Sequence, residues 1–303
     1  MRLGYLLPTR EHVMTGEHGT RELLDLARTA ADCGFKSLWV GDSLVARPRH
    51  DPITLLAGVA IAVPQLALGT AVLLPALRNP VVLAQQLATV DQLSEGRLIV
   101  GAGIGADAPT VRAEFAAASV PFEKRVGRLV EGFNLCRALW QGEPVTWDGR
   151  WTLQEATLAP RPYREGGPPI WLASSVEPGV QRIARLFDGW FPIGPNACEV
   201  ARLHDVLEAE AKAQERPTPT TAVYLTICID EDRARADEQI NTYLESYYQL
   251  PATLMRSVQA CCGGPLEEVQ AFLNGFIEAG ASELVLRIVG EHRAALNKLT
   301  PLN

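Results

Sequence analysis

The sequence lacks any apolar run of the roughly 20 residues that a membrane-spanning helix needs. It also lacks runs of like charge and low-complexity tracts, so its composition gives no sign of disorder. The 28 basic residues are scattered and the formal net charge is −7, which argues against a nucleic-acid partner. We therefore expect a folded protein that binds neither membranes nor nucleic acids.

Metal-binding and export signals are missing as well. The six cysteines form no Cys-x-x-Cys pair and have no histidine array nearby, so we expect reduced thiols and no metal site. The N-terminus opens directly into a strand-like segment, without the charged and apolar regions of an export signal. These absences predict a cytoplasmic protein.

The chain does contain a regular alternation of short apolar runs and helical segments. Runs rich in Val, Ile, Leu and aromatic residues are typical of strands covered on both faces, as in parallel sheets. Eight such strands in the α/β class predict a (β/α)8 TIM barrel, and we expect residues 1–303 to form one such domain. The expected strands are 2–8, 36–42, 66–74, 97–103, 170–173, 188–192, 222–229 and 283–289.

Helix signals separate these strands. Thr20 is placed to cap a helix that Gly34 ends, and Asn79 caps a helix whose first turn starts with a proline. Two crossovers are too long for one helix, which predicts insertions after strand 4 and strand 7. The first should hold a helix near 123–141 and a hairpin near 145–153. In the second, three tyrosines and Leu250 could line a pocket or a subunit contact, or could equally pack a lengthened helix.

Three stretches carry a set of motifs in a fixed order. Residues 34–42 read Gly-Phe-x-x-x-Trp-x-x-Asp, and residues 68–105 include Arg-Asn-Pro, Ser-Glu-Gly-Arg and Gly-Ala-Gly-Ile-Gly. Residues 160–190 include Pro-Arg-Pro, Ile-Trp-Leu-Ala-Ser-Ser and Asp-Gly-Trp. In order and spacing the set resembles the luciferase-like monooxygenase superfamily, whose members use FMN or the deazaflavin coenzyme F420.

The resemblance implies a cofactor site at the carboxyl ends of the strands. It places a cis peptide that backs the flavin ring at Ala71-Val72, and a carboxylate at the ring edge at Asp42. From the residues alone, an ordinary trans bond and a structural cap explain these positions as well. The resemblance also places the cofactor phosphate at the loop after strand 5 and the cofactor tail near Gly194, which could otherwise be a plain turn. The residues of the phosphate loop are Ala173, Ser174 and Ser175.

Serine hydroxyls and free N–H groups at a helix start suit an anion, but the carboxylate of Glu177 opposes one there. Arg182 and Arg185 could offset that charge or could simply be solvated surface residues.

Two catalytic positions of the family are altered in this chain. Ser43 stands where many members have histidine, and Ala106 where the sugar-phosphate dehydrogenases have glutamate. Replacement candidates lie in the loop after strand 2, where His50 could exchange a proton and Arg47, or its neighbour Arg49, could bind an anion. A solvated loop explains the same residues. His12 and His18, after strand 1, are weaker candidates.

These observations predict an oxidoreductase that uses reduced FMN and O2 to oxygenate a small organic substrate, served by a separate flavin reductase. Hydride transfer with F420 is the alternative. A barrel that binds no cofactor is a further one. Gly101 to Ala106 also fits the Gly-x-Gly-x-x-Gly/Ala fingerprint of a Rossmann dehydrogenase, but follows the fourth strand rather than the first. We expect a homo-oligomer, such as a dimer.

Overall fold

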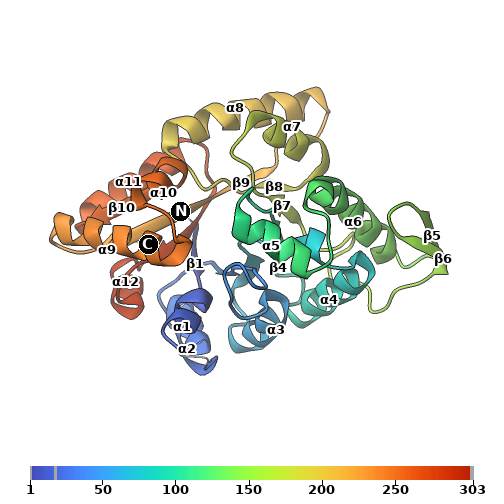
Figure 1. The fold of residues 1–303 in the computed structure, drawn as a ribbon, viewed down its shortest axis with the longest axis horizontal. Helices are drawn as coiled ribbons and strands as arrows, with labels where there is room; N and C mark the ends of the chain where they lie inside the picture. The colour runs from blue at the N-terminus through green and yellow to red at the C-terminus, as the bar shows by residue number, and fades with distance from the viewer. Residues whose placement is uncertain (1, 17–18, 301–303) are drawn as a thin grey trace. The chain divides into compact units, whose positions relative to one another are not determined.

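The computed structural model describes residues 2–16 and 19–300, and Figure 1 shows its helices and strands. The chain divides into two compact units. The first unit comprises residues 1–8, 19–39 and 170–303, and the second comprises residues 9–18 and 40–169. That the whole chain is one domain stays a prediction.

The strands form a closed parallel barrel, as the sequence predicts. Their order is β9-β11-β1-β2-β3-β4-β7-β8, and a further pairing of β8 with β9 closes the ring. Each of the eight expected strands is present within a few residues of its expected bounds. They are β1 (Arg2–Leu6), β2 (Ser37–Val40), β3 (Ala67–Thr70), β4 (Leu98–Ala102), β7 (Ile170–Leu172), β8 (Gly189–Trp190), β9 (Thr220–Ile229) and β11 (Glu283–Ile288).

In the first unit, β1 lies between β11 and β2, and Tyr5 has Leu286 and Leu38 as its neighbours across the sheet. All three side chains are fully buried, as expected for strands covered on both faces. The helices of this unit are α2 (Arg21–Asp32), α7 (Glu177–Leu186), α8 (Ala197–Ala213), α9 (Arg233–Tyr248), α10 (Ala252–Val258), α11 (Leu266–Glu278) and α12 (His292–Lys298). The expected cap of α2 is wrong in detail, since Thr20 has helical backbone angles and its side chain makes no capping bond.

The second unit contains β3, β4 and the helices α1 (Thr9–Met14), α3 (Pro52–Ala62), α4 (Pro80–Leu93), α5 (Pro109–Ala117) and α6 (Arg125–Trp140). Two single turns of 3-10 helix, η1 (Pro75–Leu77) and η2 (Phe122–Lys124), precede α4 and α6. The cap expected at Asn79 is confirmed, and Asp51 caps α3 in the same way. The side chain of Asn79 accepts a hydrogen bond from Val81 N at 2.9 Å, and that of Asp51 accepts one from Thr54 N at 2.8 Å.

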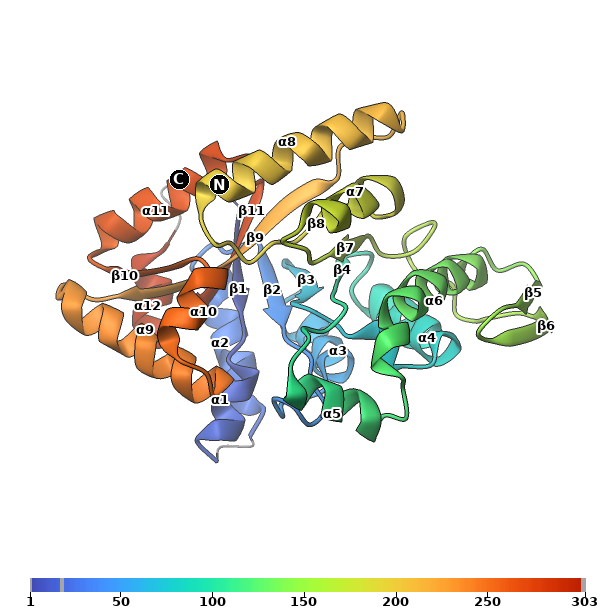
Figure 2. The ribbon, with the colours of Figure 1, turned by 45° about the horizontal axis from the view of Figure 1, so that its top comes forward.

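Both expected insertions are present. After β4, the chain forms α5, α6 and a hairpin of β5 (Val145–Asp148) and β6 (Thr152–Ala156), which projects beyond α6 in Figure 1. After β9, the helix expected to be lengthened is three separate helices, with the unexpected strand β10 (Cys261–Gly264) before α11. Figure 2 shows α9 and α10 beside β10, which pairs with the end of β9. Among the residues that the structure describes, no helix is both long and apolar enough to cross a membrane.

A buried hydrogen-bond chain at the start of the barrel strands gives a pH-dependent stability. Trp39 Nε1 donates to Ser37 Oγ at 2.7 Å, and Ser37 Oγ donates to the carboxylate of Glu283. Burial raises the pKa of the Glu283 carboxyl, against the opposing effects of Ser37 and the Arg2 charge. Because the folded-state pKa is raised, ionisation of Glu283 costs stability as the pH rises through the unfolded and then the folded value.

We therefore expect Glu283→Gln, which keeps the acceptor oxygen, to be more stable than the wild type at neutral pH and no more stable below about pH 4. Urea unfolding of both proteins across this range measures the difference. Glu278→Gln, at an exposed carboxylate, is the control. A stability difference that stays constant with pH would contradict the assignment.

Candidate active site

Asp42 follows the end of β2. Its side chain is 1 % exposed, and both carboxylate oxygens accept hydrogen bonds. The Arg78 guanidinium donates to both of its oxygens, at 2.5 and 2.9 Å, and Leu74 N donates to Oδ2 at 2.9 Å. Arg78 also reaches Asp51 Oδ2 at 3.3 Å. Burial opposes the charge on Arg78, but its bonds to the two carboxylates raise the pKa of the guanidinium. Asp42 therefore ties the end of β2 to the segment after β3.

The peptide bond between Ala71 and Val72 is cis, as the resemblance implies. It follows β3 directly, and Ala71 N donates to Val40 O at 2.8 Å. A methyl group on Gly103, after β4, would lie 2.6 Å from Val72 Cγ2, so only glycine lets these segments approach so closely. Ala71 and Val72 are partly exposed, and they leave a small-residue surface beside the buried Asp42 carboxylate.

Ser43 and the buried Glu114 organise the loop that follows Asp42. Glu114 Oε1 accepts hydrogen bonds from Ser43 Oγ at 2.6 Å and from three successive backbone N–H groups of residues 44–46, at 2.5, 2.9 and 3.2 Å. Ser43 Oγ in turn accepts a bond from Arg47 N at 2.8 Å. The residue at the family's histidine position is therefore a structural part of the loop. Sequence reasoning missed Glu114, and its position between the apolar Val111 and Phe115 on α5 was the available signal.

The rest of this loop carries the sequence-predicted candidates Arg47 and His50. Both side chains are partly exposed, and the loop ends at Asp51, the cap of α3. Arg49 Nε donates to Arg47 O at 3.1 Å. His50 Nδ1 is buried and has no hydrogen-bond partner among residues 2–16 and 19–300. A buried ring nitrogen that is left open suits a group that receives a partner from a ligand.

The other candidates of the second unit lie elsewhere. His12 is buried in α1, and His18 lies outside the described residues. Ala106 is exposed in the loop before α5. This loop argues against a Rossmann dehydrogenase. Gly105 is followed by a loop rather than by a helix, and the glycine motif follows the fourth strand of the barrel.

In the first unit, the residues Ala173 to Ser175 form the expected loop between β7 and α7. Ser174 Oγ bonds locally to the backbone of Val176, and Trp190 Nε1 donates to Ser174 O at 2.8 Å. A methyl group on Gly179 would overlap the Ser174 side chain, so glycine lets the first turn of α7 close against the loop. Within the part of the chain that is described, the N–H groups of residues 174 and 175 have no partner, so they are available to an anion.

The charge of Glu177, which opposes an anion at this loop, is paired from another helix. Arg202 of α8 lies 3.4 Å from its carboxylate. Arg185, which the sequence offered as an offset, pairs with Glu210 instead, at 2.7 Å. The cation that offsets Glu177 is thus one that sequence reasoning did not name.

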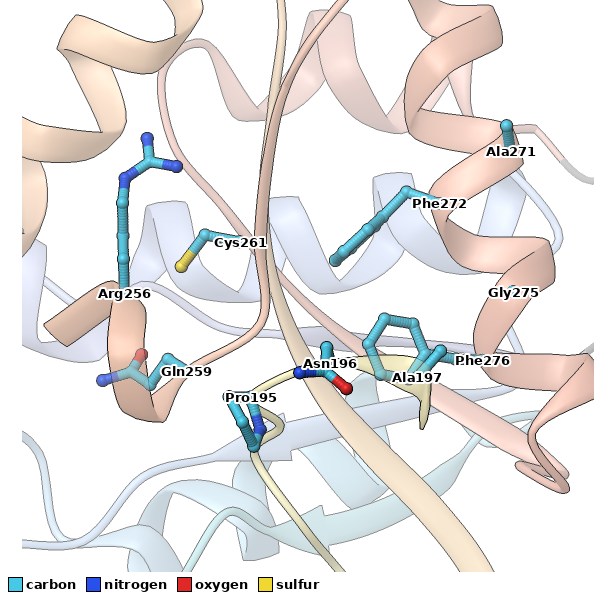
Figure 3. Close-up of a pocket in the computed structure, with 10 residues that line it drawn as sticks. All are labelled: Pro195, Asn196, Ala197, Arg256, Gln259, Cys261, Ala271, Phe272, Gly275 and Phe276. Atoms are coloured by element: carbon cyan, nitrogen blue, oxygen red, sulfur yellow. The ribbon is translucent and has the colours of Figure 1, made fainter. Parts of the chain in front are cut away.

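Gly194 has a φ of 123°, in the region that favours glycine, and a side chain there would lie 2.5 Å from Ala260 N. Packing between the β8 loop and the residue before β10 therefore accounts for this glycine. Beyond it, Pro195 and Asn196 line a cavity of about 450 Å³. Figure 3 shows Phe272 and Phe276 on one side of this cavity and Arg256 and Gln259 on the other.

A buried cation, Arg287, lies near the end of β11 behind Gln259. It is 1 % exposed, and its guanidinium donates to Thr226 Oγ1, Gln259 Oε1 and Tyr248 Oη. Four tyrosine rings surround it, those of Tyr224, Tyr243, Tyr247 and Tyr248. The tyrosines of the second insertion thus pack around a charge, which sequence reasoning did not anticipate. Across the described residues, Arg287 has no carboxylate partner.

These features fit a flavin-type cofactor. The cis peptide with small Ala71 suits a flat ring, and the open N–H groups of residues 174 and 175 suit a phosphate. No group of three metal-ligating side chains occurs in residues 2–16 and 19–300.

Comparison with known proteins decides the family. The model of the family described as luciferase-like monooxygenase matches residues 1–284. The chain belongs to this family. An F420-dependent glucose-6-phosphate dehydrogenase of Kineococcus radiotolerans is 29 % identical over 90 % of this chain and 88 % of that protein. The enzyme of the same name from Nakamurella multipartita is 32 % identical over 73 % of this chain and 67 % of its own length. The one from Nocardia farcinica is 36 % identical, but over just 53 % of its own length.

Solved structures of other enzymes share the fold. A monooxygenase from Streptomyces bottropensis superposes with a TM-score of 0.84 at 22 % identity, covering 99 % of this chain and 98 % of that one. An F420-dependent secondary alcohol dehydrogenase superposes with a TM-score of 0.83 at 20 % identity, covering 99 % and 97 %. The protein is thus a luciferase-like oxidoreductase. The names of its relatives agree with the expected choice of cofactor, FMN or F420.

Proposed function

We propose that the protein is an F420-dependent oxidoreductase that transfers hydride between the deazaflavin and a small organic substrate. The alignment of 90 % of the chain with an F420-dependent dehydrogenase carries this proposal. The monooxygenase reaction with reduced FMN and O2, which the sequence favoured, has support from structural likeness at 16–22 % identity, and such likeness speaks to the fold alone. It becomes the alternative outcome of the test.

The substrate is proposed to differ from glucose 6-phosphate. Ser43 and Ala106 replace the histidine and glutamate that the resemblance assigns to sugar-phosphate dehydrogenases, and Ser43 is committed to holding its loop. A substrate that gives up hydride from carbon must also lose a proton from oxygen. We assign that proton to His50, whose buried Nδ1 is open. A small, partly apolar alcohol or carbonyl compound is the proposed substrate class.

The proposed cofactor-binding residues are each argued within their own unit. Ala71 and Val72 would back the ring, with Asp42 fixing the strand end beside them. The loop at Ser174 and Ser175 would bind the cofactor phosphate, and the backbone at Gly194 would lie beside the cofactor tail. When bound, F420 supplies the ring carbon that exchanges hydride, and Arg47 remains a candidate for binding an anionic group.

The first test is titration of the purified protein with F420 and with FMN. We expect F420 to bind, with a change in its fluorescence, and to be reduced by members of an alcohol panel in the absence of oxygen. Oxygen uptake with reduced FMN, coupled to substrate oxygenation, would favour the monooxygenase instead. Size-exclusion chromatography of the same sample tests the predicted homo-oligomer.

The second test replaces the proposed proton acceptor. His50→Gln should lower turnover of F420 by about 100-fold, because general acid–base catalysis typically contributes that much. Its affinity for F420 should stay within a factor of three. His204→Gln, in α8, whose Nδ1 is paired with Thr221 Oγ1 at 3.1 Å, is the matched control, and equal effects of the two substitutions would exclude the role proposed for His50.

A further inference from the structure

Gly41, between β2 and Asp42, has no conformational need to be glycine. Its φ does not lie in the left-handed region, so its backbone could carry any side chain. Space is the constraint. A methyl group on Gly41 would overlap Arg49 Nη1 and would lie 3.3 Å from Arg49 Cζ. The Arg49 guanidinium therefore packs directly on the Gly41 backbone.

This contact places a cation beside the cis peptide. The position that a Gly41 side chain would take lies 3.5 Å from the Ala71 carbonyl oxygen as well as against Arg49. Ala71 begins the cis bond to Val72. The Arg49 side chain thus reaches back from its loop to the ends of β2 and β3, whereas its neighbour Arg47 is bonded through its backbone to Ser43.

The loop that carries Arg49 is fixed at both ends. At its start, Glu114 accepts bonds from residues 43–46. At its end, Asp51 caps α3 and contacts Arg78. In between, Arg49 Nε donates to Arg47 O at 3.1 Å, which orients the guanidinium. A long cationic side chain held this way loses little freedom when a ligand binds, so its contact is well suited to binding.

We propose that Arg49 is a cofactor-binding residue that donates hydrogen bonds to an oxygen of the redox ring, with Gly41 providing the space for its guanidinium. This inference rests on the proposed function, since it needs a ring at Ala71-Val72. The guanidinium stays protonated at neutral pH, so it exchanges no proton and acts by balancing negative charge on the ring. Neither Gly41 nor Arg49 is among the residues that the sequence motifs assign to the cofactor.

The experiment measures the dissociation constant of F420, without substrate, by fluorescence titration. Arg49→Gln should weaken binding about 10-fold, and Arg49→Lys, which keeps the charge but loses the planar fork, by less. Gly41→Ala should weaken binding to a similar degree because it displaces the guanidinium. The double variant should bind no more weakly than Arg49→Gln. Arg28→Gln, at an exposed ion pair in α2, is the control and should bind as the wild type does.

The outcomes separate this inference from the proposed function. If the wild type binds F420 and Arg49→Gln binds it equally well, the inference is wrong and the proposed function stands. If the effects of Gly41→Ala and Arg49→Gln multiply in the double variant, Gly41 does not act through Arg49, and the inference is likewise overturned. If the wild type binds neither F420 nor FMN, both proposals fail. Thermal unfolding of each variant without cofactor shows whether a loss of binding comes from a loss of fold.

Discussion

Arg78→Leu is expected to destabilise the protein by about 3–5 kcal/mol, the usual cost of removing one partner from a buried ion pair. The Asp42 carboxylate is 1 % exposed, and two of its three hydrogen bonds come from this guanidinium. Without Arg78, a buried negative charge keeps a single backbone donor, that of Leu74. Urea unfolding of the variant and the wild type measures the loss.

A second substitution, at Asp42, shows whether the unpaired Asp42 charge causes the loss of stability. Asp42→Asn combined with Arg78→Leu removes both charges and should recover a large part of the loss, because no uncompensated ion remains. Simple additivity of the two single losses would mean that the residues contribute separately. Arg28→Gln, in a surface ion pair, should change stability by less than 1 kcal/mol, the order typical of exposed pairs.

Glu114→Ala should cost about 3 kcal/mol, because each orphaned buried donor costs on the order of 1–3 kcal/mol and water can reach part of this loop. Four donors converge on one oxygen of this carboxylate, the Ser43 hydroxyl and three successive backbone N–H groups. The loss should be local, so hydrogen exchange at residues 44–46 should accelerate more than exchange in the barrel strands.

Glu114→Gln provides the graded comparison. Its amide oxygen can accept the same bonds without the charge, so we expect less than half of the loss seen with alanine. Ser43→Ala, which removes one of the four donors, should cost about 1 kcal/mol. Unchanged exchange at residues 44–46 in Glu114→Ala would show that the loop is held by other contacts.

The sequence by itself determined the barrel and the family. Eight apolar runs separated by helix signals were sufficient because strands that are buried on both faces must be apolar throughout, a pattern visible along the chain. A local signal also worked where the chemistry is local, as with the Asn79 cap. The motif order pointed to Asp42 and to the Ala71-Val72 bond, and that bond is cis in the structure.

Tertiary structure decided which side chains meet. Glu114 is 71 residues from Ser43 in the sequence, and Arg287 is 61 residues from Thr226, so no local sequence pattern predicts either contact. The sequence did not predict strand β10, because Cys-Cys-Gly-Gly has little strand propensity of its own and forms a strand by pairing with β9. No local pattern marks Gly41, because its constraint is the Arg49 guanidinium that packs against it. Each of these features depends on space and hydrogen-bond partners that the folded chain supplies, and a linear sequence does not show them.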